Sequence, residues 1–393
     1  MKILIATDTY YPNVNGAAYF TYRLAQMLAK RGHHVFVIAP SQTLKDTIHI
    51  DDAGVTVCGV RSISVPIYPN FRISPLTISK KSIKKLVRQI CPDVIHIQNH
   101  FLIGKGVLEV AKELNIPIMG TNHFMPENLV HYLHLPKFLE RKLKVLVWRQ
   151  FIYVYEQLDL VTAPTKIAAK QLEDLGLKKK VLPLSCGIDL QRFNPRNNGA
   201  YLKKKYSIPD RKILLYVGRL DKEKRIEIIL RAMPIILQKS DVQLVLAGIG
   251  KLQTHIEHIV DIFGIQDHVT LTGFIPDNDL PNLYTIADVF VIAGIAELQG
   301  IVTMEAMASG LPVVAVNAMA LPELVHDGEN GYLFPNGNSQ ILAERVIQIL
   351  TNQRLRDQMA QKSIEIIQAH DIHRIIAEYE SVYQQIIAQH IHV

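Results

Sequence analysis

Two kinds of hydrophobic pattern alternate along this chain. Short apolar runs rich in β-branched residues, typical of buried strands, occupy residues 2–8, 34–40, 55–60, 94–98, 117–121, 160–164 and 181–185. Between several of them apolar residues recur at helical spacing, over 18–31, 79–90, 106–114 and 166–175. This alternation predicts a parallel sheet with helices on both faces.

The pattern breaks over residues 190–210, where Pro195, Gly199 and Pro209 stand among asparagines and lysines, and we predict a linker there. A second strand series follows at 213–217, 242–247, 269–271, 289–293, 312–316 and 331–334, with helices over 338–350, 352–369 and 371–390. The chain is therefore expected to form two doubly wound α/β domains that face each other across a cleft between their strand ends.

Length and composition agree with two folded domains. A chain of 393 residues is too long for one core, and 48% apolar with 20% charged residues is typical of a soluble globular protein. No apolar run is long enough to cross a membrane, and the predicted strand at the start leaves no room for a signal peptide. Cys58, Cys91 and Cys186 provide neither a disulfide framework nor metal-ligand spacing, which favours the cytoplasm.

Positive charge is concentrated in the first half of the chain. The net charge is +7; residues 1–195 carry 25 Lys and Arg against 14 Asp and Glu, whereas residues 196–393 carry 18 against 22. Such a basic half can meet nucleic acid, a phosphorylated ligand or an anionic membrane, or it can be an ordinary solvated surface.

The most informative motif runs from Glu297 to Glu305, two carboxylates eight positions apart. Glu297 is expected to project from the loop at the carboxyl end of a strand, where open α/β sheets bind ligands. Glu305 is expected to point back toward the same crevice from the following helix. We interpret the pair as a grip on the hydroxyl groups of a polyhydroxylated ligand.

A cationic loop follows the first strand of the second series. Gly218 allows a tight turn, and Arg219 and Lys224 come before the next helix. Fixed cations beside a helix N-terminus suit a diphosphate, which an Arg fork can bind through two oxygens. A solvated loop with an incidental run of charges is the alternative.

Weaker glycine signals follow two other strands. Gly248 and Gly250 come after the strand at 242–247, and Gly16 opens the first helix after Asn13 and Asn15. Glycines there let a ligand approach the backbone, and the loop at Gly16 could present N–H groups to a phosphate or a sugar. Neither segment is a G-x-G-x-x-G dinucleotide fingerprint.

His123 follows the strand at 117–121 and is expected to point into the cleft, although a lone histidine is more often structural. Asp277 and Asp279 formally match a D-x-D metal motif, but we interpret them as turn and helix-cap residues. No Gly-x-Ser-x-Gly, Walker or His-Glu-x-x-His motif is present. The sequence therefore points to neither a protein nucleophile nor a metal.

Two stretches combine cations with apolar residues, at 80–88 and 136–153. Cations with interfacial aromatics are typical of a helix that lies on an anionic bilayer, whereas a helix packed on its own domain is the alternative. The candidate membrane or acceptor residues are Lys137, Arg141, Lys142, Lys144, Trp148 and Arg149.

Together these motifs resemble the group 1 family of retaining glycosyltransferases, which have the GT-B fold. The resemblance rests on the order of the glycine loop, His123, Gly-Arg-Leu-x-x-Glu-Lys, Gly-x-Gly, Glu-x7-Glu and Met-Ala-Ser-Gly-x-Pro-Val-Val-Ala, and it covers nearly the whole chain. It implies two Rossmann-like domains: an acceptor-binding domain of residues 1–192 plus 371–393, and a nucleotide-sugar-binding domain of residues 205–370. The last helix returns to the first domain in that fold.

The resemblance implies that Arg219 and Lys224 hold the donor diphosphate and that Glu305 binds the ribose hydroxyls. Glu297 would contact the donor sugar and support the positive charge that develops at its anomeric carbon. Preorganised cations stabilise the departing diphosphate, and one such group is worth roughly 3–4 kcal/mol. With no nucleophile evident, a front-face mechanism is implied, in which the departing phosphate takes the acceptor's proton. Neither a metal nor another cofactor is expected.

The resemblance also implies roles for the remaining site residues, each at the position that matches the family's motif. Gly16 would belong to a loop that closes over the donor, and His123 would lie near the sugar 6-hydroxyl as a further catalytic residue. The other donor-binding residues are Gly218, Gly250, Phe274, Leu298, Gln299, Gly300 and Ile301, with the Phe274 region meeting the nucleobase through its backbone.

The acceptor is suggested by a departure from the family pattern. Many members have Ser-Phe-Gly after the first glutamate, and this chain has Leu298-Gln299-Gly300, which is similar to the branch acting on diacylglycerol and related lipids. The expected reaction is therefore transfer of a hexose, from UDP-glucose or a similar donor, to a membrane lipid at the inner face of the cell membrane. Nucleic acid is not expected as a partner.

Three alternatives stay open. The same chemistry could use a soluble sugar or a polysaccharide acceptor. A nucleotide-sugar epimerase on the same fold would be expected to show further carboxylates and histidines in the cleft, which we do not find. A non-catalytic carbohydrate-binding relic is disfavoured by the intact Arg219, Lys224, Glu297 and Glu305.

Overall fold

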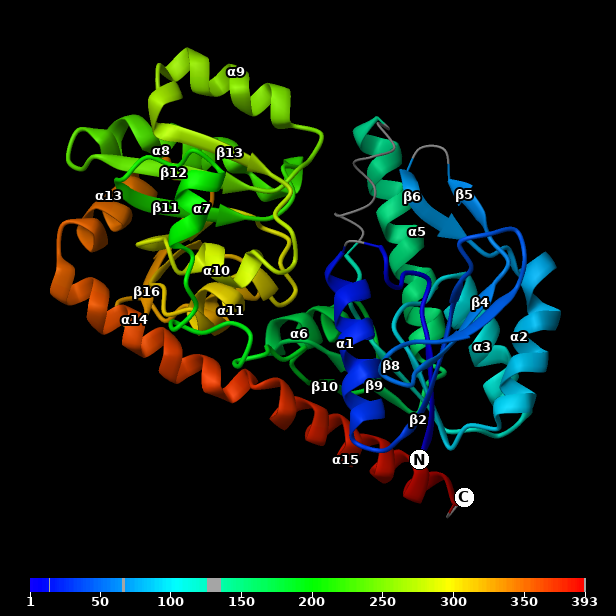
Figure 1. Cartoon of the computed structure of the whole chain (residues 1–393). Helices are drawn as coiled ribbons and strands as arrows, with labels where there is room; N and C mark the ends of the chain where they lie inside the picture. The colour runs from blue at the N-terminus through cyan, green and yellow to red at the C-terminus, as the bar shows by residue number, and fades with distance from the viewer. Residues whose placement is uncertain (14, 66–67, 126–135, 392–393) are drawn as a thin grey trace. The chain divides into compact units, whose positions relative to one another are not determined.

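The computed structural model describes residues 1–13, 15–65, 68–125 and 136–391, and these form two compact units (Figure 1). Unit 1 comprises Met1–Cys186 and Ile375–Val393, and unit 2 comprises Gly187–Arg374. The segment 190–210, predicted to be a linker, belongs to unit 2, where Phe193 and Leu202 are buried in the hydrophobic core. The domain bounds 1–192 plus 371–393 and 205–370, and the cleft between the domains, stay predictions.

Unit 1 contains an open sheet with the strand order β10-β9-β8-β7-β1-β2-β4-β3, in which every neighbouring pair is parallel except β3 with β4. A separate hairpin, β5 with β6, was not predicted, nor was β3. The strands of unit 1 are β1 (Lys2–Ala6), β2 (His34–Pro40), β3 (Thr47–Ile50), β4 (Thr56–Val60), β5 (Ile63–Val65), β6 (Tyr68–Ile73), β7 (Val94–Ile97), β8 (Ile118–Thr121), β9 (Leu160–Ala163) and β10 (Val181–Pro183). Its helices are α1 (Gly16–Lys30), α2 (Leu76–Ile90), α3 (Leu102–Glu113), α5 (Lys137–Tyr155), α6 (Lys166–Asp174) and most of α15 (Ile372–Ile391).

Unit 2 contains a six-stranded sheet, among the described residues, in which every neighbouring pair is parallel. Its order is β13-β12-β11-β14-β15-β16, the order of a dinucleotide-binding α/β domain. The strands are β11 (Lys212–Val217), β12 (Val242–Ala247), β13 (Val269–Gly273), β14 (Val289–Ile292), β15 (Val313–Val316) and β16 (Gly331–Phe334). The helices are α7 (Ala200–Lys205), α8 (Ile226–Leu237), α9 (Gln253–Phe263), α10 (Leu280–Tyr284), α11 (Ile301–Ala308), α12 (Leu321–Leu324), α13 (Ser339–Leu350) and α14 (Gln353–Ile367).

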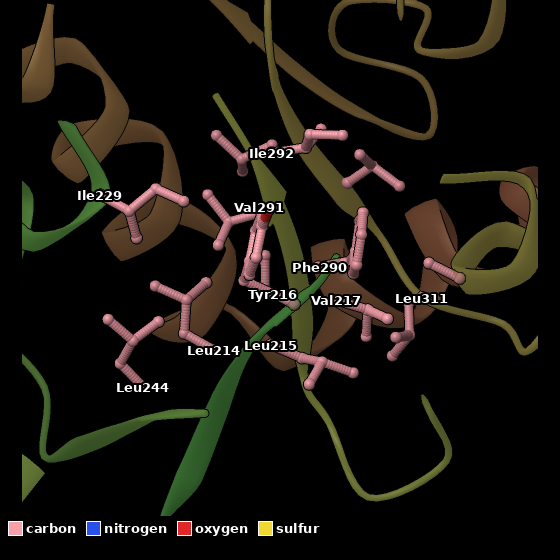
Figure 2. Packing of buried hydrophobic residues seen from close by; sticks show 14 of the residues in the cluster. Leu214, Leu215, Tyr216, Val217, Ile229, Leu244, Phe290, Val291, Ile292 and Leu311 are labelled. Carbon is pink, nitrogen blue, oxygen red and sulfur yellow. The ribbon is translucent and has the colours of Figure 1, made fainter. Parts of the chain in front are cut away.

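The central strands of unit 2 are buried on both faces, which explains their almost continuous apolar runs. Figure 2 shows Leu214 and Leu215 of β11 beside Phe290 and Val291 of β14, with Ile229 contributed by α8. Packing on both faces holds these strands in place, and with them the start of each loop at their carboxyl ends.

The final helix, α15, packs on unit 1. Tyr379 and Tyr383 are fully buried, and the Tyr383 hydroxyl lies 2.8 Å from Nδ1 of His96 in β7. Glu380 forms ion pairs with Arg31 at 2.7 Å and with His33 at 2.8 Å. Across the described residues, we find no helix with the length and apolar character needed to cross a membrane.

Candidate active site

The sheet of unit 2 reverses its strand order between β11 and β14. The two strands pair directly, Leu214 with Val289 and Leu215 with Phe290, while β12 lies on the other side of β11. At such a switch point the loops leaving the carboxyl ends diverge to opposite faces and leave a crevice, which is the usual ligand site of a doubly wound sheet. The loop after β11 and the loop after β14 carry the predicted cationic and acidic residues, so the structure brings these residues to one sheet edge.

Glycines allow the loops after β11 and β12 to pack directly against each other. Gly218 and Gly248 have φ angles of 149° and 146°, which side chains rarely tolerate. A Cβ on Gly248 would lie 1.9 Å from the carbonyl oxygen of Gly218, and one on Gly250 would lie 2.3 Å from that of Leu220. Gly250, predicted to bind the donor, is therefore required by packing inside unit 2.

The guanidinium of Arg219 is clamped by two carboxylates of its own loop. Its Nη1 donates to Oδ2 of Asp221 and its Nη2 to Oε1 of Glu223, both at 2.6 Å. The two carboxylate side chains are 6% and 7% exposed, whereas Arg219 keeps 35%. Asp221 also accepts the backbone N–H of Lys251 at 3.1 Å, which ties the loop after β12 to the clamp. The arrangement fixes the cationic fork at the sheet edge and hides its anionic partners.

Lys224 and Glu297 form an ion pair of 2.5 Å between Nζ and Oε1. Both side chains are largely buried, at 19% and 13% exposed. A Cβ on Gly294 would lie 3.2 Å from that Oε1, so the glycine leaves room for the pair. Lys224, predicted to bind phosphate, and Glu297, predicted to contact the sugar, are thus in direct contact. They come from the loops after β11 and β14, the two strands of the switch point.

Gly300 starts α11 in the left-handed region, with φ of 76°. The three residues Leu298, Gln299 and Gly300 are buried in the turn, and Ile301 is the first helical residue. The first N–H groups of a helix have no partner within the helix and favour an anion. The turn therefore places an anion-binding backbone beside the ion pair.

Glu305 lies inside α11 and is 8% exposed. Its Oε2 accepts the hydroxyl of Tyr284, in α10, at 2.7 Å. Burial and the adjacent carboxylate raise the pKa of Tyr284 well above its usual value, so the phenol stays protonated and keeps donating. The structure thus places Glu305 in a buried contact within unit 2; its contact with ribose stays a prediction.

Phe274 follows β13 at the outer edge of this sheet and is 53% exposed. Asp277 pairs with Arg192 at 2.8 Å, and the Asp279 carboxylate accepts the Tyr201 hydroxyl and Lys205 Nζ, both at 2.6 Å. Asp279 is the N-cap residue of α10, in agreement with its interpretation as a helix-cap residue, but its side chain makes no cap hydrogen bond because Tyr201 and Lys205 of α7 bind its oxygens. The described part of the chain has no group of three His, Cys, Asp or Glu placed to hold a metal ion.

Two predicted residues lie in unit 1, at the carboxyl ends of its strands. Gly16 is the first residue of α1, and Oδ1 of Asn15 caps that helix by accepting the N–H of Ala18 at 2.9 Å. His123 follows β8, and its Nε2 lies 2.9 Å from Oε1 of Gln98. Desolvation lowers the pKa of His123 to about 3, so the imidazole is neutral at physiological pH.

Two further buried polar residues after strands of unit 1, Asp8 and His100, were not predicted from the sequence. Asp8, after β1, is 4% exposed, and its Oδ1 accepts the N–H of Ile103 at 3.0 Å, at the start of α3. Burial raises the pKa of Asp8 to about 6. His100, after β7, is buried among Phe101, Phe124 and Phe151, and burial lowers its pKa to about 4. The available signal was a polar residue two or three positions after each of two apolar strands, β1 and β7.

Helix α5 divides the predicted membrane residues between two faces. Trp148 packs edge-on against Phe151, with ring centroids 5.4 Å apart, and Lys144 pairs with Glu140 at 2.9 Å. The other face carries exposed apolar side chains among cations and borders a groove of about 760 Å³. The residues lining that groove are Lys137, Phe138, Arg141, Lys142, Val145, Leu146 and Arg149. The aromatic residue that accompanies the cations is thus Phe138, whereas Trp148 packs within unit 1.

The second basic stretch, in α2, is largely neutralised by its own unit. Lys80 pairs with Glu109 at 2.7 Å, and Lys84 and Arg88 pair with Glu113 at 2.6 and 3.0 Å. Both acidic residues belong to α3. The packed-helix alternative therefore describes this stretch better than a membrane surface does.

The chain matches two family descriptions in succession. Residues 14–192 match Glycosyltransferase Family 4, and residues 200–366 match Glycosyl transferases group 1. An alpha-monoglucosyldiacylglycerol synthase from Streptococcus pneumoniae is 32% identical over 345 residues, which cover 85% of this chain and 75% of that protein. A GDP-mannose-dependent alpha-mannosyltransferase from Corynebacterium glutamicum is 26% identical over 334 residues, covering 85% and 76%.

A solved structure shows the same fold over the full length. Sucrose-phosphate synthase from Thermosynechococcus elongatus superposes with a TM-score of 0.83 at 23% identity, covering 99% of this chain and 100% of that one. The fold and the sequence matches together define a glycosyltransferase with the GT-B fold. The chain belongs to the group 1 glycosyltransferase family, which confirms the predicted family, fold class and class of enzyme.

Proposed function

We propose that this enzyme transfers a hexose from a nucleotide sugar, UDP-glucose or a close relative, to a hydroxyl of a membrane lipid such as diacylglycerol. The reaction retains the anomeric configuration and uses no bound metal. The observation that carries the proposal is the similarity to a protein named as a glucosyldiacylglycerol synthase, together with a charged switch-point site that suits a sugar diphosphate.

The diphosphate of the donor would bind at the sheet edge of unit 2. The Arg219 side chain is 35% exposed, Lys224 follows in the same loop, and the positive end of the α11 helix dipole adds to their charge. Diphosphate oxygens would compete with Glu297 for the Lys224 ammonium. Donor binding therefore exchanges an internal ion pair for a charge-assisted contact with the ligand.

The proposed chemistry needs no protein nucleophile. The bond between the anomeric carbon and the phosphate oxygen breaks, and its electron pair goes to the departing phosphate, where Arg219 and Lys224 stabilise the charge. Glu297 stabilises the positive charge on the sugar. The acceptor oxygen bonds to the anomeric carbon on the face that the phosphate leaves, and its proton passes to that phosphate. His123, being neutral, would serve as a hydrogen-bonding group for the sugar rather than as an acid.

The groove face of α5 supports a lipid surface as the partner of unit 1. Phe138 and Leu146 are each 62% exposed, and Arg141 and Lys142 lie on the same face. Apolar groups between cations suit an anionic bilayer, in which the side chains reach the headgroup boundary while the cations meet lipid phosphates. This would make the enzyme a peripheral protein of the inner membrane face.

The donor and acceptor are tested together. A thermal-shift panel of UDP-, GDP- and ADP-sugars identifies the nucleotide, because a ligand that binds only the folded state raises the Tm by mass action. We expect UDP-glucose to give the largest shift; GDP-mannose is the second candidate, since the similar mannosyltransferase is named for that donor. The selected radiolabelled donor is then incubated with diacylglycerol vesicles or with soluble sugars. Label found only in soluble sugars would overturn the lipid acceptor.

Membrane binding is tested with a matched pair of charge variants. Arg141→Gln with Lys142→Gln removes two cations from the groove face of α5, and Lys81→Gln with Lys85→Gln removes two exposed cations from α2. In sedimentation with anionic vesicles, we expect the α5 variant to lose about thirtyfold in binding, at roughly 1 kcal/mol for each of the two cations near the surface, and the α2 variant to bind as the wild type does. Equal losses would refute a specific role for α5.

A further inference from the structure

A second groove, of about 210 Å³, lies at the carboxyl end of the unit 1 sheet. The residues that follow β1 and β2 form one side of it, and the β3–β4 hairpin forms the other. In that hairpin Thr47 pairs with Gly59 and His49 with Val57, so the four side-chain positions share one face. A Cβ on Gly59 would lie 2.3 Å from Oγ1 of Thr47, and the glycine therefore allows the hairpin to close tightly under the groove.

The wall of this groove is a rigid aromatic platform. The ring of Tyr11 lines the groove and is stacked on Tyr22, with centroids 4.9 Å apart and an interplanar angle of 25°. Tyr10, which lines it as well, packs edge-on against the same Tyr22 at 5.9 Å. Tyr11 nevertheless remains 58% exposed. An aromatic face held in place by stacking presents apolar area to a ligand at little cost in conformational entropy.

The polar side chains that line the groove carry hydroxyl, amide and imidazole groups. Within the part of the chain that the structure describes, the lining contains no Asp, Glu, Lys or Arg, although unit 1 is the basic half of the protein. Gln42, Thr47 and His49 line the groove and make no side-chain hydrogen bond to other described residues. Apolar walls with a few uncommitted polar groups are typical of a small-molecule site. Amide, hydroxyl and imidazole groups suit hydroxyls, whereas a phosphate would lack a cation.

We propose that this groove binds the uncharged, hydroxyl-bearing head of the acceptor, a glycerol or a single sugar unit, and selects against phosphorylated heads. The inference rests on the proposed function and deepens it, because it divides the two lipid contacts of unit 1. The cations of α5 bind the surface of a bilayer that contains anionic lipids, whereas the groove binds the head of one neutral acceptor molecule. The volume also fits, since it is below the roughly 300–1,000 Å³ of sites for drug-sized ligands and suits one ring or one glycerol unit.

The test fills the groove from β3 and uses the opposite face of the same strand as its control. Thr47→Trp places a large ring in the groove, whereas Ile48→Trp adds the same ring at a position that is 65% exposed and pairs with Cys58, outside the groove lining. We expect Thr47→Trp to lower kcat/KM for diacylglycerol at least tenfold through KM, with the thermal shift by the nucleotide sugar unchanged. Ile48→Trp should stay within twofold of wild type in both readouts. Equal effects of the two variants, or loss of the nucleotide shift in Thr47→Trp, would overturn the proposal.

A second arm tests the selection against charge. Wild-type enzyme is compared with Gln42→Arg, using as acceptors a monoacylglycerol and its 3-phosphate (lysophosphatidate), which has the same acyl chain and keeps one free hydroxyl, with diacylglycerol as the reference. We expect wild type to use the phosphorylated lipid at least a hundredfold less well, and Gln42→Arg to narrow that ratio about tenfold. Equal use of both lipids by wild type contradicts a neutral head site. If only soluble sugars accept label, the lipid function fails, and Thr47→Trp then tests the groove with the accepted sugar.

Discussion

The two units expose different chemistry at equivalent edges of similar sheets. At the carboxyl edge of unit 2, charged side chains are partly buried in pairs: Arg219 with Asp221 and Glu223, and Lys224 with Glu297. At the carboxyl edge of unit 1, the polar groups include two histidines whose pKa desolvation lowers, His100 and His123, and one buried carboxyl, Asp8, whose pKa burial raises to about 6. One architecture therefore presents paired charges in one unit and mainly uncharged polar groups in the other, because the loops rather than the strands carry the chemistry.

The largest effect is expected at the charged edge. Glu297→Gln keeps the shape of the side chain and removes the charge that faces Lys224. We expect kcat to fall by about 10²–10³, or roughly 3–4 kcal/mol, because a group that stabilises transition-state charge is lost, while the Kd for the nucleotide sugar changes only a few-fold. Single-turnover kinetics and calorimetric titration measure the two quantities. The exposed Glu344→Gln serves as the control, and a kcat within threefold of wild type for Glu297→Gln would remove the basis of the assignment.

The neutral edge should make unit 1 sensitive to acid. His100 is buried among three phenylalanines, and burial lowers its pKa from 6.5 to about 4. An unfolded chain binds a proton there below pH 6.5 and the folded chain does not, so stability falls as pH drops, by up to about 1.4 kcal/mol per pH unit between pH 6.5 and pH 4.

His100→Phe removes this proton linkage and fits the aromatic surroundings. The free energy of unfolding, from urea titrations at pH 7, 6 and 5, should therefore decline less on acidification in the variant, by about 2 kcal/mol over the range. Asp8 has the opposite effect on the pH dependence of stability, since a carboxyl whose pKa burial raises to about 6 takes up a proton on folding. Because Asp8 is present in both proteins, its contribution cancels when the two pH profiles are compared. Parallel pH profiles would show that His100 is protonated in the folded state.

The comparison of the two units also shows which features of the fold and of the site could be predicted from the sequence. Strands such as β11, β12 and β16 were placed within a residue or two because strands buried on both faces leave continuous apolar runs. Motif spacing located Arg219, Lys224, Glu297 and Gly300 because each follows a strand end in the chain.

Side-chain contacts that depend on the tertiary structure could not be predicted from the sequence. The clamp of Asp221 and Glu223 on Arg219 depends on a one-turn helix over Lys222–Lys224, and the β3 strand is exposed along its whole length and leaves little hydrophobic signal. Trp148 was grouped with the cations of α5, and the sequence could not show that it packs against Phe124, which comes from a different segment. Buried polar residues such as Asp8 and His100 lack a motif, since their burial arises only when β1 and β7 become neighbours.

The role of Asp221 and Glu223 in positioning Arg219 can be tested by removing one of the two carboxylate charges. Glu223→Gln leaves Asp221 in place and weakens one of the two bonds to the Arg219 guanidinium, each 2.6 Å long. A hydrogen bond between charged groups is worth about 1.5–3 kcal/mol, so we expect the KM for the donor to rise about tenfold with a smaller change in kcat. Glu227→Gln, in the first turn of α8, is the matched control. Tighter donor binding in Glu223→Gln would mean that the carboxylate competes with the diphosphate instead of positioning the arginine.

The smallest expected effect concerns the anchoring of α15 on unit 1. Glu380 is 14% exposed and accepts from Arg31 and His33; burial opposes its ionisation, but these hydrogen bonds and charges lower its pKa below the usual value. Its contribution is thus complete at neutral pH and disappears as pH falls through the folded pKa, below about 4.5. Glu380→Gln should cost about 1 kcal/mol of unfolding free energy at pH 7. Glu365→Gln, which removes the exposed pair with Lys362 in unit 2, should cost no more than about 0.5 kcal/mol. Equal costs would show that a half-buried pair anchors α15 no better than a solvated one.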